Sequence, residues 1–332
     1  MKIQAPYLLF LGDANDELSI KMAKGVADWR PEQCVGEYRL NNCTVSTGQP
    51  AMDIKTAKAA GAKTFVLSFA NSGGTIDPAW IPFIIEALEN DMHVVSGLHQ
   101  KLTDIEQVSE LAERRGLDLI DIRHPSQSFN TGKGYKRSGK RLITVGTDCS
   151  VGKMYTSLCI EKAMKAQGFD VDFRASGQCG ILIAGDGVAI DCVVADFIAG
   201  ASETLSPDNT SEHWDIVEGQ GALSHPAFAG VSLGLLHGAQ PDAIVICHAI
   251  NRSTMRGLDN RPLPSIAQTI ELNLAAARVT NPNAKVAAIA VNTSSVDERE
   301  ALKICNAIAI EHNLPCVDPV RHGVDAIIGN LT

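Results

Sequence analysis

Short runs of apolar residues alternate with amphipathic stretches along the first 122 residues of the chain. Continuous apolar runs predict buried strands, and stretches with an apolar residue every three or four positions predict helices. The predicted strands cover residues 7–11, 64–69, 93–96 and 117–122, and the predicted helices cover residues 20–26, 82–89 and 105–115. Strands that alternate with helices are typical of βαβ units, so we expect a doubly wound α/β domain with a mostly parallel sheet.

The same alternation returns after a polar stretch at residues 125–140, which is rich in Ser, Gly and Lys and has no apolar period. The predicted strands of this second part are 141–145, 215–217, 243–247 and 286–291, and the predicted helices are 153–167, 265–278 and 296–312. We interpret the polar stretch as a linker. We therefore expect two domains, residues 1–135 and 136–332; the alternative is a long surface loop within one domain.

A glycine-containing loop follows the first strand of the second domain and leads directly into a helix. In α/β folds the ligands bind at such strand ends. The loop has the context of a P-loop, whose backbone amides and helix N-terminus surround phosphate groups, and its lysine adds a cation. The alternative is a glycine-rich turn that binds no ligand. The candidates for binding the phosphates of a nucleotide-like cofactor are Gly146, Thr147, Asp148, Cys149, Ser150, Val151, Gly152, Lys153 and Met154.

Met154 stands where P-loop NTPases carry a serine or threonine. The hydroxyl of that residue normally coordinates Mg²⁺, which bridges two phosphates of the nucleotide. A thioether is a soft ligand and Mg²⁺ prefers hard oxygens. We therefore expect the loop to hold a diphosphate, such as that of coenzyme A, without cleaving a triphosphate and without a required metal.

Glu218 lies at the end of another predicted strand, in the sequence Asp-Ile-Val-Glu-Gly-Gln-Gly. A carboxylate at this position is typical of the Walker B site of NTPases and would face the loop. Without a metal it can act as a general base. The alternatives are a carboxylate that caps the next turn, or one that pairs with Lys153 for structural reasons.

Polar residues at other strand ends are candidates for binding a substrate. Arg252 and Arg256 follow His248, and guanidinium groups bind carboxylates by paired hydrogen bonds, so they can receive a dicarboxylate. Surface ion pairs are the alternative for each arginine. His99 is either a functional or a structural histidine. The candidates in the first domain are Asn71, Gly73, Gly74 and His99.

Charge and cysteine content narrow the class of protein. The net charge is −9, which disfavours binding to a nucleic acid backbone. Nine cysteines are scattered without a metal-binding spacing, and their odd number favours a reducing, cytoplasmic location. No apolar stretch approaches the ~18 residues that suggest a membrane span. We expect a homodimer, the commonest oligomer of such enzymes.

Five motifs carry a resemblance to a known family: GTDCSVGKM, RASGQCGILIAGDG, ADFIAGASE, DIVEGQG, and NSGG followed by SGLH. The first also resembles the phosphate-binding loop of dethiobiotin synthetases. Together, over essentially the whole chain, they resemble the DgcN-type D-glutamate N-acetyltransferases, a family formerly classed as a domain of unknown function. The resemblance implies an N-terminal Rossmann-like domain, a C-terminal P-loop α/β domain, and transfer of the acetyl group of acetyl-CoA to the amine of D-glutamate in D-amino acid catabolism.

The candidate residues supply a mechanism compatible with this implied activity. An amine is nucleophilic only when neutral, so a base must remove its proton; Glu218 is our first candidate and Asp196 our second. Arg252 and Arg256 are then candidates for the substrate carboxylates. Loop amides or Lys153 can stabilise the tetrahedral oxyanion. An acetyl-cysteine on Cys149 is an alternative ranked lower, because no histidine is evident beside it.

Three other functions fit parts of the sequence less well. An ATP-dependent ligase or kinase of the dethiobiotin synthetase type, acting on a small carboxylic acid, conflicts with Met154. A non-catalytic nucleotide-binding regulator would bind phosphates without turnover. An NAD-dependent oxidoreductase conflicts with the first domain, where Gly12-Asp13 lacks the glycine pattern of dinucleotide-binding folds.

Overall fold

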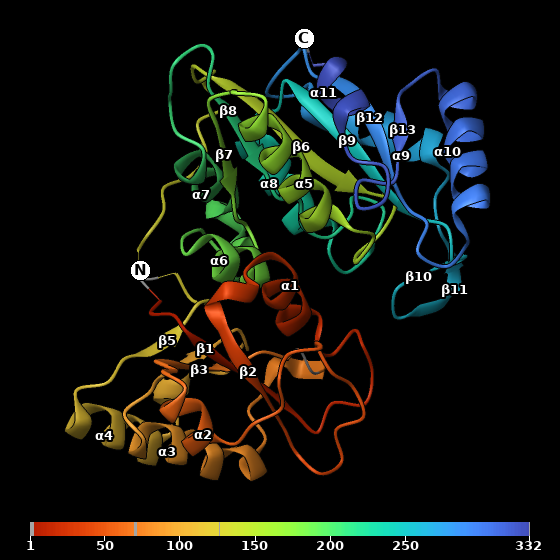
Figure 1. The fold of residues 1–332 in the computed structure, drawn as a ribbon. Helices are drawn as coiled ribbons and strands as arrows, with labels where there is room; N and C mark the ends of the chain where they lie inside the picture. The colour runs from red at the N-terminus through yellow and green to blue at the C-terminus, as the bar shows by residue number, and fades with distance from the viewer. Residues whose placement is uncertain (1–2, 70–71, 126, 332) are drawn as a thin grey trace. The chain divides into compact units, whose positions relative to one another are not determined.

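The computed structural model describes residues 3–69, 72–125 and 127–331 (Figure 1). The chain divides into two compact units. Unit 1 consists of Met1–Ser126 together with Gly177–Cys192, and unit 2 consists of Gln127–Ser176 together with Val193–Thr332. The sequence analysis assigns residues 177–192 to the C-terminal domain, whereas the structure places this segment in unit 1.

Unit 1 contains a five-stranded, entirely parallel sheet in the order β2-β1-β3-β4-β5. Its strands are β1 (Tyr7–Gly12), β2 (Cys34–Arg39), β3 (Thr64–Leu67), β4 (His93–Ser96) and β5 (Leu119–Asp121). The four predicted strands are confirmed, with ends that differ by at most two residues. The apolar pattern missed β2, an edge strand that contains the buried Glu37 and ends at the exposed Arg39.

Helices cover both faces of this sheet, as a doubly wound fold requires. They are α1 (Lys21–Trp29), α2 (Ile54–Ala59), α3 (Ile81–Glu89), α4 (Glu106–Arg115) and α6 (Gln178–Ala184). In Figure 1, α2, α3 and α4 lie below the sheet and α1 lies above it. Leu8, Phe10, Phe65 and Leu67 fill the core beneath the sheet, because their side chains alternate onto that face.

The segment 177–192 belongs to unit 1 because α6 packs against α1 and several hydrogen bonds hold it there. The guanidinium group of Arg123 donates to Oε1 of Gln178 through Nε at 3.1 Å and Nη2 at 2.8 Å. The same side chain pairs with Asp191, Nη1 to Oδ2, at 3.0 Å. These partners lie far from Arg123 in sequence, so a local sequence pattern cannot predict the contacts.

Unit 2 contains a six-stranded parallel sheet in the order β13-β12-β9-β6-β8-β7, and a small antiparallel hairpin. The sheet strands are β6 (Lys140–Gly146), β7 (Val171–Arg174), β8 (Trp214–Val217), β9 (Ala243–Ala249), β12 (Lys285–Asn292) and β13 (Cys316–Val317). The hairpin strands are β10 (Thr254–Met255) and β11 (Leu258–Pro262). All four predicted strands are confirmed within two residues, and β7 and β13 were missed.

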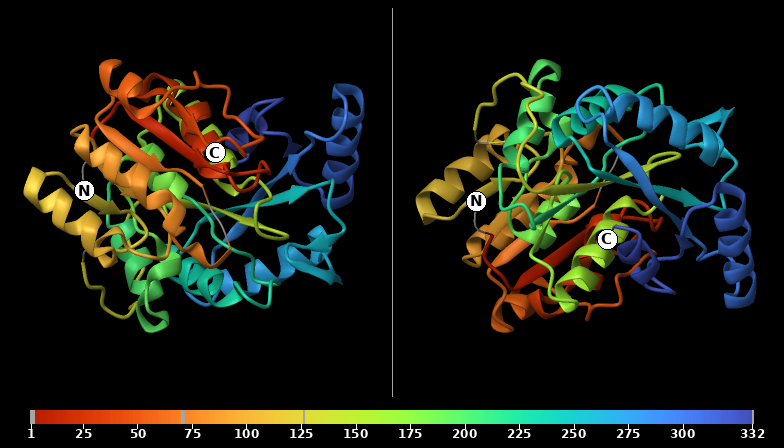
Figure 2. Two further views of the ribbon diagram at one scale, coloured as in Figure 1. Left: turned by 90° about the horizontal axis from the view of Figure 1, so that it is seen from below. Right: turned by 90° about the horizontal axis from the view of Figure 1, so that it is seen from above.

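The helices of unit 2 also lie on both faces of their sheet (Figure 2). They are α5 (Lys153–Ala166), α7 (Ile198–Leu205), α8 (Ala229–Ala239), α9 (Ile266–Ala277), α10 (Glu298–His312) and α11 (Asp325–Gly329). On one face α5 packs against β6, β7 and β8, and on the other face α8 and α9 pack against β6, β9 and β12. The expected doubly wound α/β architecture is therefore present in both units.

The polar stretch that we interpreted as a linker is irregular, and its described part from residue 127 onwards is held against α7 of unit 2. The backbone amides of Lys133 and Gly134 donate to Oε1 of Glu203 at 2.9 and 2.8 Å. Arg137 is buried and donates through Nε to the carbonyl of Ser206 at 2.7 Å. Hydrogen bonds between side chains and backbone thus fix a segment whose composition alone suggests a flexible linker.

Within the part of the chain that the structure describes, no helix has both the length and the apolar character needed to cross a bilayer.

Candidate functional site

The loop between β6 and α5 has the backbone conformation of an anion-binding turn. Gly152, the last residue before α5, has φ +100° and Ser150 has φ +54°, so the chain turns in the left-handed region just before the helix begins. A Cβ atom on Gly146 would lie 2.6 Å from Cγ2 of Val151, so glycine is required where the loop closes on itself. The amides at the start of α5 have no partner within the helix and are available to an anion.

Lys153 is buried, with 7% of its surface exposed, and its side chain folds back over the loop. Its Nζ donates to the carbonyl oxygen of Asp148 at 2.9 Å. Gly219 lies beside the lysine stem, since a Cβ atom there would sit 3.1 Å from Cδ of Lys153. Burial lowers the pKa of Lys153 below its ordinary value, and Cys149, Cys247 and Asp148 partly oppose this shift.

Asp148 joins the loop to the segment that carries the two candidate arginines. Its fully buried carboxylate accepts from the backbone amide of Arg256 at 2.7 Å and pairs with Nη2 of Arg252 at 3.0 Å, both through Oδ2. Arg252 also donates to the carbonyl of Cys149 at 2.7 Å, and Arg256 donates to the hydroxyl of Ser150. Both arginines therefore contact the phosphate-binding loop itself.

His225 holds the backbone next to Arg256 in place. It was not among the residues predicted from the sequence. The ring is buried, and its Nδ1 accepts from the amide of Ala227 at 3.2 Å, so its Nε2 carries the proton. That Nε2 donates to the carbonyl of Arg256 at 3.0 Å. The ring also lies against Phe228, with centroids 4.6 Å apart. His225 thus fixes the turn between β10 and β11 next to the loop.

His248, near the end of β9, is a second histidine at the loop. Its Nδ1 lies 3.0 Å from the hydroxyl of Thr147. Burial lowers the pKa of His248, and the positive charge of Arg252 lowers it further. A histidine with a lowered pKa is neutral at pH 7, which is the form that can accept a proton.

Glu218 directly follows β8 and is buried near β6, the strand that leads into the loop. Its Oε2 accepts from the amide of Ser176 at 3.0 Å. The next residue, Gly219, donates its amide to the hydroxyl of Thr144 on β6 at 3.1 Å. The structure therefore brings Glu218 to the strand that feeds the phosphate-binding loop. Asp196, in the turn Ala195–Phe197, is exposed, and no described hydrogen bond or ion pair joins it to the loop.

The hydroxyl groups that follow Met154 along α5 are turned into the core. The hydroxyl of Thr156 accepts from Sγ of Cys247 at 3.6 Å, and the hydroxyl of Ser157 lies 3.0 Å from that of Thr144. Both side chains are buried. Neither hydroxyl is presented to the loop as the metal-binding hydroxyl of an NTPase is.

Asp148, Cys149 and His225 each offer one ligand atom, and these atoms lie within 4.8 Å of one another. The surroundings do not favour a cation, since Arg252 already pairs with Asp148 and the buried Lys153 is close by. Both ring nitrogens of His225 are also engaged. We assign no metal to this group. A hollow of about 10 Å³ lined by Gly146 and Gly219 has room for about one water molecule, and therefore not for a phosphate.

The candidates of unit 1 lie after β3 and β4, at the carboxyl end of its sheet. A Cβ atom on Gly74 would lie 2.5 Å from Cδ2 of His99, so glycine at this position makes room for the imidazole ring. Gly73 has φ +83° and open space around it, and Asn71 lies outside the described residues. The structure thus brings Gly74 and His99 into contact.

His99 is held in one tautomer by Arg123. Nη1 of Arg123 lies 2.5 Å from Nε2 of His99, and a guanidinium can only donate, so Nε2 is the acceptor and Nδ1 carries the proton. That Nδ1 lies 3.6 Å from Sγ of Cys192. Burial, and then the charge of Arg123, lower the pKa of His99, so the ring is a neutral donor and not a base at Nδ1.

Two family models match the chain. A P-loop domain described as a domain of unknown function, DUF1611_C, matches residues 128–328, and the Rossmann-like DUF1611_N domain matches residues 36–125. These descriptions confirm the fold class expected from the sequence.

Individual proteins match over the full length. A curated protein from Pseudoalteromonas sp is 64% identical over 331 residues, covering 100% of both chains, and one from Tritonibacter scottomollicae is 46% identical over 329 residues, covering 99% of both. Both are named D-glutamate N-acetyltransferase, which confirms the resemblance seen in the motifs. The crystal structure of a DUF1611 family protein from Anabaena variabilis is similar with a TM-score of 0.89 and 27% identity, over 99% of each chain. The chain therefore belongs to the DUF1611 family, with its Rossmann-like N-terminal domain and its P-loop C-terminal domain.

Proposed function

We propose that this chain is a D-glutamate N-acetyltransferase, the activity for which its two full-length curated relatives are named. The observation that carries the proposal is the phosphate-binding loop. Lys153, Arg252 and Arg256 all contact it, and a methionine replaces the residue that would hold Mg²⁺. Such a loop suits a donor that is held by its phosphates and reacts elsewhere, as acetyl-CoA does.

The cations of the loop are assigned here to the donor. Its diphosphate would accept hydrogen bonds from the amides between Gly146 and Lys153, and Lys153 would swing from the carbonyl of Asp148 to a phosphate oxygen. Arg252 and Arg256 contact the loop directly, so we place them beside the donor phosphates and not on the substrate carboxylates. No metal is required, because three cationic side chains already offset the charge of the phosphates.

The transfer itself needs one base and one leaving group. The amine nitrogen attacks the carbonyl carbon of the thioester and a base takes the amine proton. The carbon–sulfur bond then breaks, and the protonated base returns that proton to the sulfur, which releases coenzyme A as a thiol. Glu218 is the proposed base, because it is buried next to the strand that feeds the loop. His248 is a second candidate that the sequence analysis did not consider as a base, since its lowered pKa keeps it neutral. Asp196 ranks below both, because it is exposed.

The proposed location is the cytoplasm and the proposed assembly is a homodimer. All nine cysteines are free, as in a reducing compartment. Light scattering on the purified protein tests the assembly, and twice the chain mass of 35.4 kDa is the expected result.

The activity is tested by incubating the protein with acetyl-CoA and D-glutamate or L-glutamate and following the appearance of free thiol. We expect thiol release with D-glutamate and none with the L-enantiomer. A parallel reaction with Mg-ATP and the same acids should release no ADP. ADP release would favour the alternative function, an ATP-dependent ligase or kinase. Lys165→Ala, an exposed change on the same helix as Lys153, is the control that should keep full activity.

Glu218→Gln and His248→Gln separate the two candidate bases. The variant that loses the base should keep its affinity for acetyl-CoA and lose most of its kcat, by about 10²-fold or more. Equal kcat values for Glu218→Gln and the wild type would remove Glu218 from the mechanism.

A further inference from the structure

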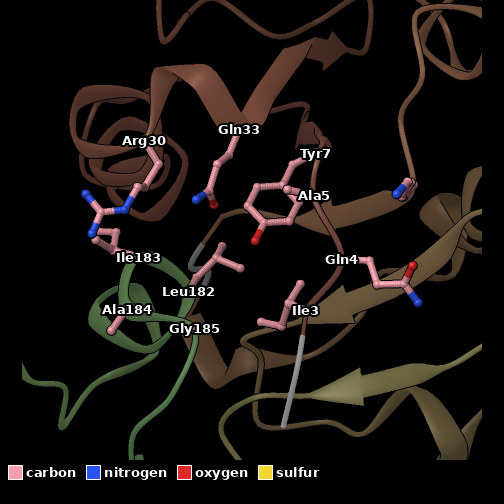
Figure 3. A pocket seen from close by; sticks show the side chains of 11 residues that line it. Ile3, Gln4, Ala5, Tyr7, Arg30, Gln33, Leu182, Ile183, Ala184 and Gly185 are labelled. Atoms are coloured by element: carbon pink, nitrogen blue, oxygen red, sulfur yellow. The ribbon is translucent and has the colours of Figure 1, made fainter.

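Unit 1 contains a cavity of about 730 Å³ that has no part in the mechanism proposed above. It lies at the amino ends of β1, β2 and β3, where Tyr7 begins β1, Gln33 precedes β2 and Lys63 precedes β3. Residues 182–185, at the end of α6, close one side (Figure 3). Small-molecule sites in proteins have volumes of roughly 300–1,000 Å³, so the cavity is of the size of a ligand site.

This cavity shares no lining residue with the candidate site described above. Gly74 and His99 follow β3 and β4 at the carboxyl end of the same parallel sheet, which is the opposite end of the strands. No residue of the loop from Gly146 to Met154 lines the cavity. An occupant of this cavity would therefore be held by other residues than those proposed for the acetyl donor.

The lining is basic in a protein that is acidic as a whole. Arg30 and Lys63 contribute positive charges and none of the lining residues is an aspartate or glutamate, although the net charge of the chain is −9. In the described part of the chain, neither cation forms a salt bridge; the guanidinium of Arg30 donates to the carbonyl of Trp29 at 2.8 Å. The cavity therefore presents unneutralised positive charge to a ligand.

The interior combines hydrogen-bonding groups with an apolar wall. Only 3% of the surface of Tyr7 is exposed. Its hydroxyl nevertheless has no hydrogen-bond partner among the described residues. In Figure 3, the side chains of Tyr7 and Gln33 both point into the cavity, and the guanidinium of Arg30 lies beside Ile183. Ile3, Leu182 and Ile183 form the apolar part of the lining.

We propose that this cavity binds a small organic anion with an apolar body. Its acidic group, a carboxylate, phosphate or sulfonate, pairs with Arg30 and accepts a hydrogen bond from the Tyr7 hydroxyl. Its apolar body lies against Ile3, Leu182 and Ile183, and Lys63 adds long-range attraction from the exposed rim. A guanidinium and a phenol that line the same cavity select for an anion, and the apolar wall selects against inorganic ions.

The proposal is tested with the full-length protein and the fluorescent anion 8-anilinonaphthalene-1-sulfonate, which carries a sulfonate on an apolar body. The wild type should bind it saturably. Arg30→Gln should weaken binding by about tenfold, because it removes the cation that pairs with the sulfonate of the probe. Lys63→Gln should weaken binding by a few-fold, because this cation attracts the probe only from a distance. Both positions are at least partly exposed, so the variants should unfold at the wild-type temperature.

Lys55→Gln is the matched control, because it removes the same charge from an exposed position on α2 that does not line the cavity. It should bind the probe like the wild type. Lys153→Met should also bind it like the wild type, which separates this site from the phosphate-binding loop. Equal affinity of the wild type and the Arg30→Gln variant, or a loss of binding in the Lys153→Met variant alone, would overturn the proposal.

Discussion

Both units begin with a parallel strand that ends in glycine, but the space beyond the two strands is used in opposite ways. At the end of β1, Gly12 has φ +60°, and a Cβ atom there would lie 3.5 Å from the indole of Trp80. Phe69 packs against Trp80 with ring centroids 4.3 Å apart, and α1 does not begin until Lys21. Aromatic side chains therefore fill the end of this strand.

At the end of β6, by contrast, α5 begins directly after Gly152 and the space beyond the strand is lined by amides and cations. Lys153, Arg252 and Arg256 contact this loop. The comparison teaches that the doubly wound topology only offers the position of a phosphate site. That position becomes a phosphate site only where a glycine turn leads directly into a helix and cations lie nearby. The same contrast argues against a dinucleotide site at the end of β1.

Among the changes that test the difference between the two strand ends, Lys153→Met should have the largest effect. The variant removes the cation from the loop and should raise the KM for acetyl-CoA by about 10²-fold, as the loss of a buried charged hydrogen bond does. Because burial lowers the pKa of Lys153, the folded protein holds the charged amine at a cost, and the ligand-free variant should unfold at a higher temperature. Enzyme kinetics and thermal unfolding measure the two effects, and an unchanged KM would contradict the assignment of the loop.

Gly219→Ala should break the support of the loop by crowding. The new Cβ atom would lie 1.6 Å from the carbonyl oxygen of Thr144, so β6 and residue 219 must move apart. We expect a loss of about 3 kcal/mol in the free energy of unfolding, together with lower activity. Gly230→Ala, at an exposed position of α8 with open space around it, is the control and should be neutral or stabilising. Chemical denaturation of the two variants gives the comparison.

Asp148→Asn should loosen the contact between the loop and the two arginines. The buried carboxylate pairs with Arg252 and accepts from the amide of Arg256, and an amide side chain cannot replace the charge. The KM for acetyl-CoA should rise about tenfold while kcat changes less. Asp259→Asn, an exposed change on β11, should leave both constants unchanged.

The affinity for the donor should depend on pH through Lys153. Its pKa lies below the ordinary value of 10.5, so the cation is lost as the pH rises through that lowered pKa, and binding of acetyl-CoA should weaken in the same range. Between the lowered pKa and 10.5 the unfolded chain binds the extra proton, so the ligand-free protein should gain stability as the pH rises. Binding titrations at several pH values test the first trend. Lys153→Met should abolish it, whereas Lys165→Ala should retain it.

The smallest effect is expected at the aromatic end of β1. Trp80→Leu removes buried aromatic surface and should lower the unfolding temperature. It should leave the KM for acetyl-CoA within about twofold of the wild type, because aromatic side chains fill this end of the strand. A large rise in that KM would show that the two strand ends are not used differently.

Several features of the fold could be predicted from the sequence because they are local. Continuous apolar runs gave the inner strands of both sheets within two residues. The pattern failed for β2, an edge strand, and for α8, whose Gly234 and Gly238 carry no apolar signal although they pack closely against α7. A Cβ atom on Gly238 would lie 2.1 Å from the carbonyl of Ala199, which only the folded structure reveals.

The candidate site divides in the same way. The loop from Gly146 to Met154 could be identified because its residues are consecutive. The contacts that complete it could not, because Arg252 lies 103 residues from its partner Cys149, and His225 carries no motif that distinguishes it. The same limit applies to residues 177–192, which bond to Arg123 of unit 1 from the middle of unit 2's sequence.

Isothermal titration of coenzyme A and of pantetheine, both in the presence of EDTA, tests most directly whether the loop holds a diphosphate without a metal. Pantetheine carries the same thiol and lacks the phosphates. The account predicts that coenzyme A binds at least a hundredfold more tightly than pantetheine and that the difference largely disappears in Lys153→Met. Equal affinities for the two ligands, or binding of coenzyme A that requires added Mg²⁺, would contradict it.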